Sequence, residues 1–138
     1  MYRNRLPNGS YIIFLFVRSN RIDLALDSNR DLSIGESETF SLAHNADGSF
    51  SLKSNAGLFP RDFDNGTFRT LRFDQLTLNN GVRFEILEMF ESSANSQILQ
   101  IRVNGRVLMY SNQTIRLQDV LYPIPNLTKF TFQLLSRH

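Results

Sequence analysis

The chain has 138 residues, a length that suits one domain built around a single hydrophobic core. Its formal net charge of only +2 argues against a nucleic-acid partner, because nucleic-acid-binding proteins present strongly basic surfaces. The chain has no cysteine, which excludes disulfides, thiolate metal sites and thiol nucleophiles, so packing must hold the fold.

Apolar stretches are short throughout the sequence. None approaches the roughly 18 apolar residues of a membrane-spanning helix, and the N-terminal "MYRNRLPNGS" lacks the apolar core of a secretory signal. We therefore expect no membrane insertion. We expect a cytoplasmic protein, or one that is secreted by a route without a signal peptide.

Short runs of alternating apolar and polar residues, bounded by Gly, Asn, Asp and Pro, recur from end to end. This alternation is typical of strands, and no long window keeps the helical period of about 3.6 residues. We predict an all-β protein with a single domain over residues 1–138. The predicted strands are Tyr11–Ser19, Ile22–Leu26, Asp31–Ile34, Thr39–His44, Ser49–Ser54, Phe68–Leu78, Arg83–Phe90, Gln97–Val103, Arg106–Ser111, Thr114–Val120 and Thr128–Leu135.

The pair Asn104-Gly105 separates two alternating runs and is typical of the two-residue turn of a hairpin. Such a turn fixes which residues face one another across the two strands. The predicted facing pairs are Val103 with Arg106, Ile101 with Leu108, and Leu99 with Tyr110.

Three segments, "TFSLAH", "RFEILE" and "KFTFQL", each carry a Phe at a similar place. These residues are Phe40, Phe84 and Phe130, and their spacings of 44 and 46 residues fit the lobes of a β-trefoil. The remaining positions of the segments match poorly. The β-trefoil is therefore the alternative fold.

A second set of motifs resembles the galectins, which are single-domain β-sandwich lectins of about this length. The motifs run in order along the whole chain: "LPNGSYIIFLFV" (6–17), "RIDLALDSNRDLSI" (21–34), "FSLKSNAG" (50–57), "NGTFRTLRFDQLTLNNGVRFEI" (65–86) and "IRVNGRVLMYSN" (101–112). The resemblance implies a galectin-like, two-sheet antiparallel β-sandwich, or jelly roll, and this is the predicted fold.

Galectins bind β-galactosides on one sheet, and the resemblance implies where that site would lie. The family's His-x-Asn-x-Arg strand falls on "GESET" (35–39), which places Gly35, Ser37 and Thr39 where the family has the side chains that grip galactose. The next family Asn falls on Asn55 and is kept. The stacking Trp has no counterpart, and Phe68 stands nearest to its place.

The family's Glu and Arg, which follow the Trp, fall on Thr70 and Arg72, so that only the Arg is kept. Most of the charged hydrogen-bonding network that orients galactose is therefore missing. The candidate ligand-binding residues implied by the resemblance are Asn55, Phe68, Arg72, Ser37, Thr39 and Thr70.

Each main candidate also has a purely structural interpretation. Phe68 fits a core or half-buried sheet position, and Arg72 fits a solvated strand face. Asn55 fits a turn in which its side chain bonds to local backbone.

Catalytic and metal-binding patterns are weak. The chain has two histidines, His44 and His138, and the second is terminal, which argues against a metal centre or a Ser-His-Asp triad. The acidic "DFDNG" (62–66) lacks the closing Glu of a calcium loop and is typical of a turn. We expect no enzyme activity, no catalytic residue, no metal and no cofactor.

Together these observations predict a non-catalytic binding module, a divergent galectin-like domain that serves protein–protein interaction or oligomerisation, a homodimer included, through a sheet edge or face. The alternative function is a carbohydrate-binding lectin with non-standard glycan specificity. The expected partner is therefore a protein or a glycan.

Overall fold

The computed structural model describes residues 6–78, 84–92, 96–120 and 126–138, and these residues confirm the all-β prediction. They form twelve strands and one short 3-10 helix. The strands are β1 (Gly9–Val17), β2 (Asn20–Leu26), β3 (Leu32–Ile34), β4 (Phe40–His44), β5 (Phe50–Lys53), β6 (Phe59–Asp64), β7 (Arg69–Gln75), β8 (Phe84–Ser92), β9 (Ser96–Val103), β10 (Arg106–Ser111), β11 (Thr114–Gln118) and β12 (Lys129–Arg137), and the helix is η1 (Asn126–Thr128).

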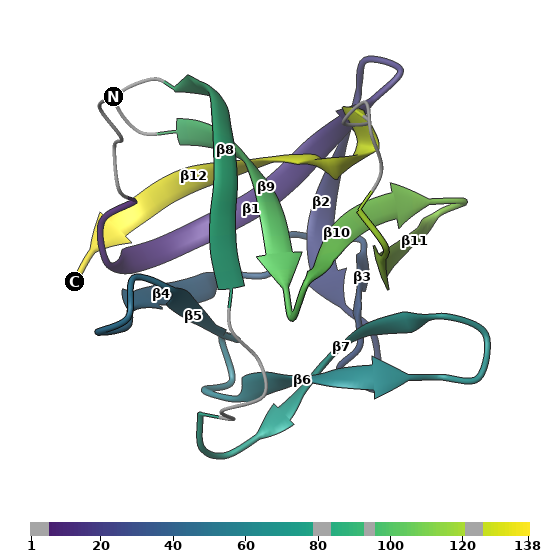
Figure 1. The fold of residues 1–138 in the computed structure, drawn as a ribbon, viewed down its shortest axis with the longest axis horizontal. Coiled ribbons are helices and arrows are strands. Elements are labelled where there is room, and N and C mark those ends of the chain that lie inside the picture. Colours follow the sequence, from purple (N-terminus) through teal and green to yellow (C-terminus); the bar gives the residue numbers. More distant parts are fainter. Residues whose placement is uncertain (1–5, 79–83, 93–95, 121–125) are drawn as a thin grey trace.

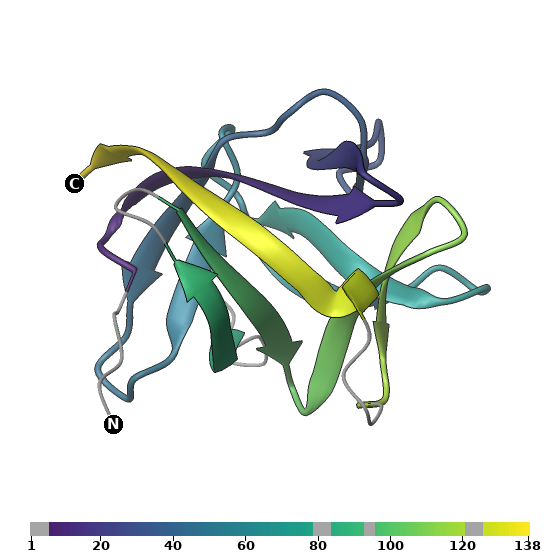
Figure 2. The ribbon, with the colours of Figure 1, turned by 90° about the horizontal axis from the view of Figure 1, so that it is seen from above.

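Six of the described strands close a barrel. In order around the ring, the strands are β1, β4, β5, β8, β9 and β12, and each is antiparallel to the next. The ring closes because β12 also pairs with β1. Figure 2 shows β12, in yellow, lying between β1 and β9. Because the ring returns to its first strand, these six strands have no open sheet edge.

The other six described strands form three hairpins, β2–β3, β6–β7 and β10–β11 (Figure 1). The hairpins contact one another, since β3 packs on both β7 and β11, and β11 pairs with β7 through Leu117 and Arg69. Each block of four consecutive strands thus contributes two barrel strands and one hairpin. Three such blocks around a closed barrel are the arrangement of a β-trefoil, the alternative fold.

The Phe residues of the three related segments occupy equivalent places in this arrangement. Each is buried at the start of the last strand of its block and pairs with a buried residue on the first strand. The pairs are Phe40 with Tyr11, Phe84 with Phe50, and Phe130 with Leu99. The repeat that the Phe spacing indicated is therefore present in the fold.

The galectin-like sandwich is not supported by these pairings. A sandwich consists of two sheets stacked face to face, whereas one ring of hydrogen bonds passes here through all six barrel strands. The motifs that resemble galectins are alternating strands and tight turns, and their local chemistry is the same in both folds. The resemblance therefore reflects local strands and turns, and it carries no information on how the strands pair.

The hairpin around Asn104-Gly105 is present as β9–β10, and its first predicted pair, Val103 with Arg106, is confirmed. After the next residue the two strands part. Leu99, expected opposite Tyr110, pairs instead with Phe130 of β12. The reason is that β9 continues into the barrel, whereas β10 leaves it and forms a hairpin with β11.

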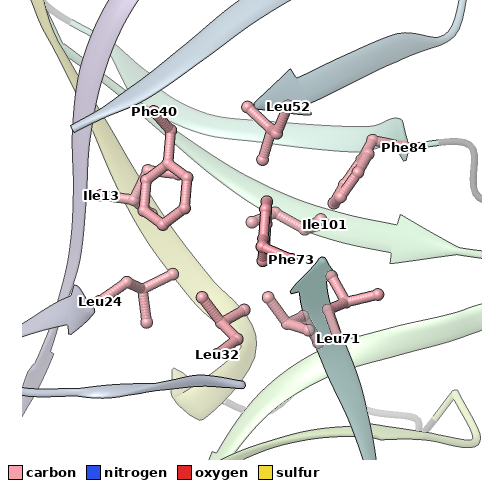
Figure 3. A pocket seen from close by; sticks show the side chains of 10 residues that line it. Ile13, Leu24, Leu32, Phe40, Leu52, Leu71, Phe73, Phe84 and Ile101 are labelled. Atoms are coloured by element: carbon pink, nitrogen blue, oxygen red, sulfur yellow. The ribbon is translucent and has the colours of Figure 1, made fainter. Parts of the chain in front are cut away.

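The barrel interior is filled by apolar side chains, which converge in Figure 3 from strands of all three blocks. They leave a cavity of about 10 Å³, which has room for about one water molecule. Its lining residues are Ile13, Leu24, Leu32, Phe40, Leu52, Leu71, Phe73, Phe84, Ile101 and Leu108. Because this lining offers no hydrogen-bonding side chain, a polar ligand must be sought on the surface.

Candidate ligand-binding surface

The outer face of the β6–β7 hairpin gathers charged and aromatic side chains. Leu71 and Phe73 of β7 point into the core, so the alternate residue Arg72 lies on the opposite side of the strand. The register pairs Arg72 with Arg61 of β6, which puts Phe63, two residues further along β6, on the same side. We call the set Asp31, Arg61, Phe63, Arg72 and Asp74 the Arg–Asp face.

Arg72 is held at two points by Asp31, which lies just before β3. Its Nε donates to Oδ1 of Asp31 at 2.6 Å and its Nη2 to Oδ2 at 3.1 Å. The side chains are only 23% and 11% exposed, so the pair is partly shielded from water. The hydrogen bond to Asp31 raises the pKa of Arg72 above its ordinary value.

Arg61 and Asp74 form a second two-point pair on the same face. Nε of Arg61 donates to both carboxylate oxygens, at 2.9 and 3.1 Å, and Nη2 donates to Oδ2 at 3.0 Å. These hydrogen bonds lower the pKa of Asp74, and the side-chain amide of Gln75 adds a bond of 2.8 Å. Asp74 is therefore a carboxylate over the ordinary pH range.

Phe63 lies beside both guanidinium groups. Cζ of Arg72 is 3.6 Å from the centre of its ring, and Cζ of Arg61 is 5.0 Å away. Both distances suit cation–π attraction, and the stacking restricts the rotamers of long side chains that would otherwise be mobile. The face is thus a pre-ordered set of planar donors and acceptors around one half-buried ring.

The sequence-predicted residue Arg72 is part of this face, whereas Thr70 lies on the same strand but is buried. The Thr70 hydroxyl group donates to the carbonyl of Ile115 at 2.9 Å and lies 3.5 Å from that of Leu32. The hydroxyl group thus joins the β6–β7 hairpin to the β10–β11 hairpin. Thr70 therefore offers no surface to a ligand in this structure.

Phe68 lies at the other end of the β6–β7 hairpin, next to its turn. Its ring is half-buried, and Cζ of Arg116 from β11 is 4.5 Å from the ring centre. Its backbone N–H donates to Oδ1 of Asn65 in the turn. Phe68 therefore belongs to a contact between hairpins that is separate from the Phe63 ring.

Ser37, Thr39 and Asn55 lie on two loops that a hydrogen bond to Glu38 joins. Ser37 and Thr39 flank Glu38 in the β3–β4 loop, and the backbone N–H of Asn55 donates to Oε2 of Glu38 at 2.8 Å. Asn55 and Ser37 are exposed and Thr39 is half-buried. The six candidates are thus distributed over three places, and only Arg72 joins the Arg–Asp face.

Asp31, Arg61, Phe63 and Asp74 were not among the ligand-binding residues predicted from the sequence. One signal was available: "FPRDFD" (59–64) places Arg61 and Phe63 two residues apart, as alternation in a strand requires. Nothing in the sequence pointed to Asp31 as the partner of Arg72, because the contact between them depends on how the hairpins pack.

Within the described residues, no group of three or more His, Cys, Asp or Glu side chains is placed to hold a metal ion. In the same ranges no helix is long and apolar enough to cross a membrane.

Comparisons with known proteins bear on the fold alone. No protein-family model matches the chain, and a search of curated proteins finds no match. Among solved structures, the chain is similar to a salivary protein from Culex quiquefasciatus that belongs to the Cysteine and Tryptophan-Rich (CWRC) family, with a TM-score of 0.66 over 98% of this chain and 99% of that one. The identity is 12%, and this chain contains neither cysteine nor tryptophan. The similarity is therefore one of fold.

Proposed function

We propose that the protein is a non-catalytic binding module that holds an uncharged, polyhydroxylated ligand, a carbohydrate, on the Arg–Asp face. The observation that carries this proposal is the pairing of both arginines with carboxylates around Phe63. It retains the lectin function that the galectin resemblance raised, but assigns it to other residues and to another fold.

The charge balance of the face favours an uncharged ligand. Two guanidinium groups and two carboxylates cancel, so an anion would have to displace Asp31 or Asp74 from its arginine before it could bind. A sugar hydroxyl group can instead accept from one group and donate to the other, since Arg has donors only and an ionised carboxylate has acceptors only.

The geometry of the face also leaves groups for such a ligand. Each arginine uses Nε and Nη2 toward its aspartate, which directs its Nη1 elsewhere. The half-buried Phe63 ring offers an apolar surface of the kind on which the C–H side of a sugar packs. Hydrogen bonds from charged groups contribute about 1.5–3 kcal/mol each, so a few of them suffice for a measurable affinity.

A protein partner is the second candidate, and two observations favour it. Leu76, directly after β7, is 84% exposed. In addition, the described pairs of β6 are with β7 only, which leaves its other edge available to an added strand, although Pro60 removes one donor from that strand. A second copy of the chain is one such partner.

A glycan array with neutral and anionic members tests the proposal, using the wild-type chain and Arg72→Gln. We expect neutral glycans to bind, and expect Arg72→Gln to weaken them by about tenfold or more. Arg21→Gln is the matched control. Arg21 also pairs with an aspartate, Asp23, and stacks on a Phe ring, but it belongs to β2 and lies outside the Arg–Asp face.

Binding to anionic glycans alone, or equal losses in the two variants, would contradict the carbohydrate proposal. A blank array together with a concentration-dependent dimer in light scattering would support the protein-partner candidate instead. Thermal melts of both variants show whether each is folded in the assay.

A further inference from the structure

A second ring with a cation beside it lies along the same strand as Phe63. Phe59 begins β6, and Nζ of Lys53 from β5 is 5.7 Å from the centre of its ring. Pro60 is buried while Phe59 and Arg61 are half-buried, so Phe59 shares the outward side of β6 with Arg61 and Phe63. Both rings therefore open onto one side of the hairpin.

Polar side chains connect the two rings. The register of β6 and β7 shifts between Phe59 and Pro60, so that Phe59 pairs with Gln75 and Asp74 is the extra residue of a bulge on β7. The bulge places the Gln75 amide and the Asp74 carboxylate side by side, at 2.8 Å, and Asp74 in turn binds Arg61. We call Lys53, Phe59 and Gln75 together with the Arg–Asp face the extended face.

We propose that the extended face binds a linear, uncharged oligosaccharide along β6, with one sugar residue at Phe63 and another at Phe59. This inference rests on the proposed carbohydrate function and names the class of carbohydrate. The two Phe residues are four positions apart in a strand, which separates them by about 13 Å. One sugar ring cannot pack on both, whereas a chain of three or four can.

The charge pattern selects this occupant over a nucleic acid strand. Stacking rings with interleaved basic residues can bind bases and phosphates, but phosphates need cations that are not already matched. Here both central arginines are held by aspartates, which would repel a phosphate backbone. A polyhydroxyl chain meets donors and acceptors in turn along the same path.

The other two hairpins carry no equivalent extended face among the described residues. On the β1–β2 hairpin, Arg21 stacks on Phe14, which is only 7% exposed, and faces the exposed Phe16, but a single Arg–Asp pair, Arg21 with Asp23, lies beside these rings instead of two. On β11, Arg116 stacks on Phe68 and donates to Thr114 rather than to a carboxylate. Although the fold repeats three times, we expect one oligosaccharide per chain.

Calorimetry on the full chain tests the inference with three probe series, namely β1,4-linked N-acetylglucosamine, β1,4-linked glucose and α1,4-linked glucose, each from one to six residues. In the series that binds, we expect affinity to rise by about tenfold or more from one residue to four and then to level off, with one site per chain. Phe59→Ala should remove most of this gain with length, and Phe63→Ala should weaken every member.

Phe16→Ala is the matched control, because Phe16 is an exposed Phe on β1 and should leave all affinities unchanged. Phe59→Leu, which keeps an apolar side chain at this position, replaces Phe59→Ala if the latter does not fold. An equal affinity for one and four residues, or a Phe59 variant that behaves like Phe16→Ala, would overturn the extended face while leaving the Arg–Asp face intact. Failure of every neutral series to bind would overturn the proposed function itself.

Discussion

Arg72 and Asp31 are joined by two hydrogen bonds although they lie 41 positions apart and belong to hairpins of different blocks. A backbone bridge links the same two residues, and the N–H of Phe73 donates to the carbonyl of Arg30 at 2.8 Å. The contact therefore both connects two hairpins and orients the guanidinium group over Phe63.

Asp31→Asn should lower the free energy of unfolding by about 1–3 kcal/mol, because it leaves a partly buried guanidinium group without its charged acceptor. Urea denaturation measures the change. Arg72→Gln should also lower stability, and the double variant should cost clearly less than the sum of the two single variants, since the residues act as a pair. Additive costs would show that the two side chains are not coupled, which would contradict their action as a pair.

Thr70→Val should lower stability by about 1–2 kcal/mol without changing carbohydrate affinity, because its hydroxyl group bonds to the Ile115 carbonyl inside the protein. Chemical denaturation and calorimetry together separate the two effects. Thr70→Ser, which keeps the hydroxyl group, is the control. A loss of affinity in a fully folded Thr70→Val chain would restore Thr70 as a ligand contact.

Part of the fold could be predicted from the sequence. The bounds of Arg106–Ser111 were predicted to the residue, because Asn104-Gly105 fixes the turn and the alternation is regular. Strand β6 was missed, because Pro60 and two Asp residues make "FPRDFD" a poor strand sequence, although an edge strand tolerates them. Local patterns report strands and turns but not which strands close a barrel.

The candidate site was less predictable, for a related reason. Arg72 was found through a resemblance to a family whose sandwich the pairings do not support. Thr70 was expected beside it on the surface, but Thr70 and Leu71 are both buried, because neighbouring hairpins cover the outer side of β7 at this point. Asp31 and Phe63 come together with Arg72 only when the β2–β3 and β6–β7 hairpins pack against each other.

The β1–β2 turn stores backbone strain. Arg18 and Ser19 have φ angles of 51° and 70°, which are costly for most residues with a Cβ atom, whereas the β9–β10 turn has Asn104 and Gly105, the residue types that best tolerate such angles. Arg18→Asn combined with Ser19→Gly should therefore raise the free energy of unfolding by about 1–2 kcal/mol.

The reverse exchange, Asn104→Arg with Gly105→Ser, should destabilise the chain by a comparable amount in the same thermal or urea unfolding experiment. No gain from the first exchange, with a clear loss from the second, would mean that contacts of Arg18 or Ser19 offset the strain of their turn.

Because of Tyr11, we expect the stability of the fold to fall as the pH becomes alkaline. Burial raises the pKa of its hydroxyl group from 10.0 to about 12, and the hydroxyl group donates to the carbonyl of Pro7 at 2.6 Å. Because the folded pKa is the higher one, the contribution of neutral Tyr11 is complete below pH 10 and is lost as the pH rises toward 12.

Denaturation curves between pH 9 and 12 should therefore show stability falling by up to about 1.4 kcal/mol per pH unit from this group. Tyr11→Phe should remove this component while lowering stability at neutral pH through the lost hydrogen bond. The same alkaline slope in both chains would assign it to other residues.

The most direct test of the central claim is a ¹⁵N NMR titration of the full chain with the neutral tetrasaccharide of the series that binds in calorimetry. We predict shifts that saturate at one ligand per chain, concentrated at Arg61, Phe63, Arg72 and Asp74 and at the Nε–H signals of the two arginines. Shifts centred instead on Phe68 and Arg116, or on the loops around Ser37 and Asn55, would contradict the assignment of the ligand to the Arg–Asp face.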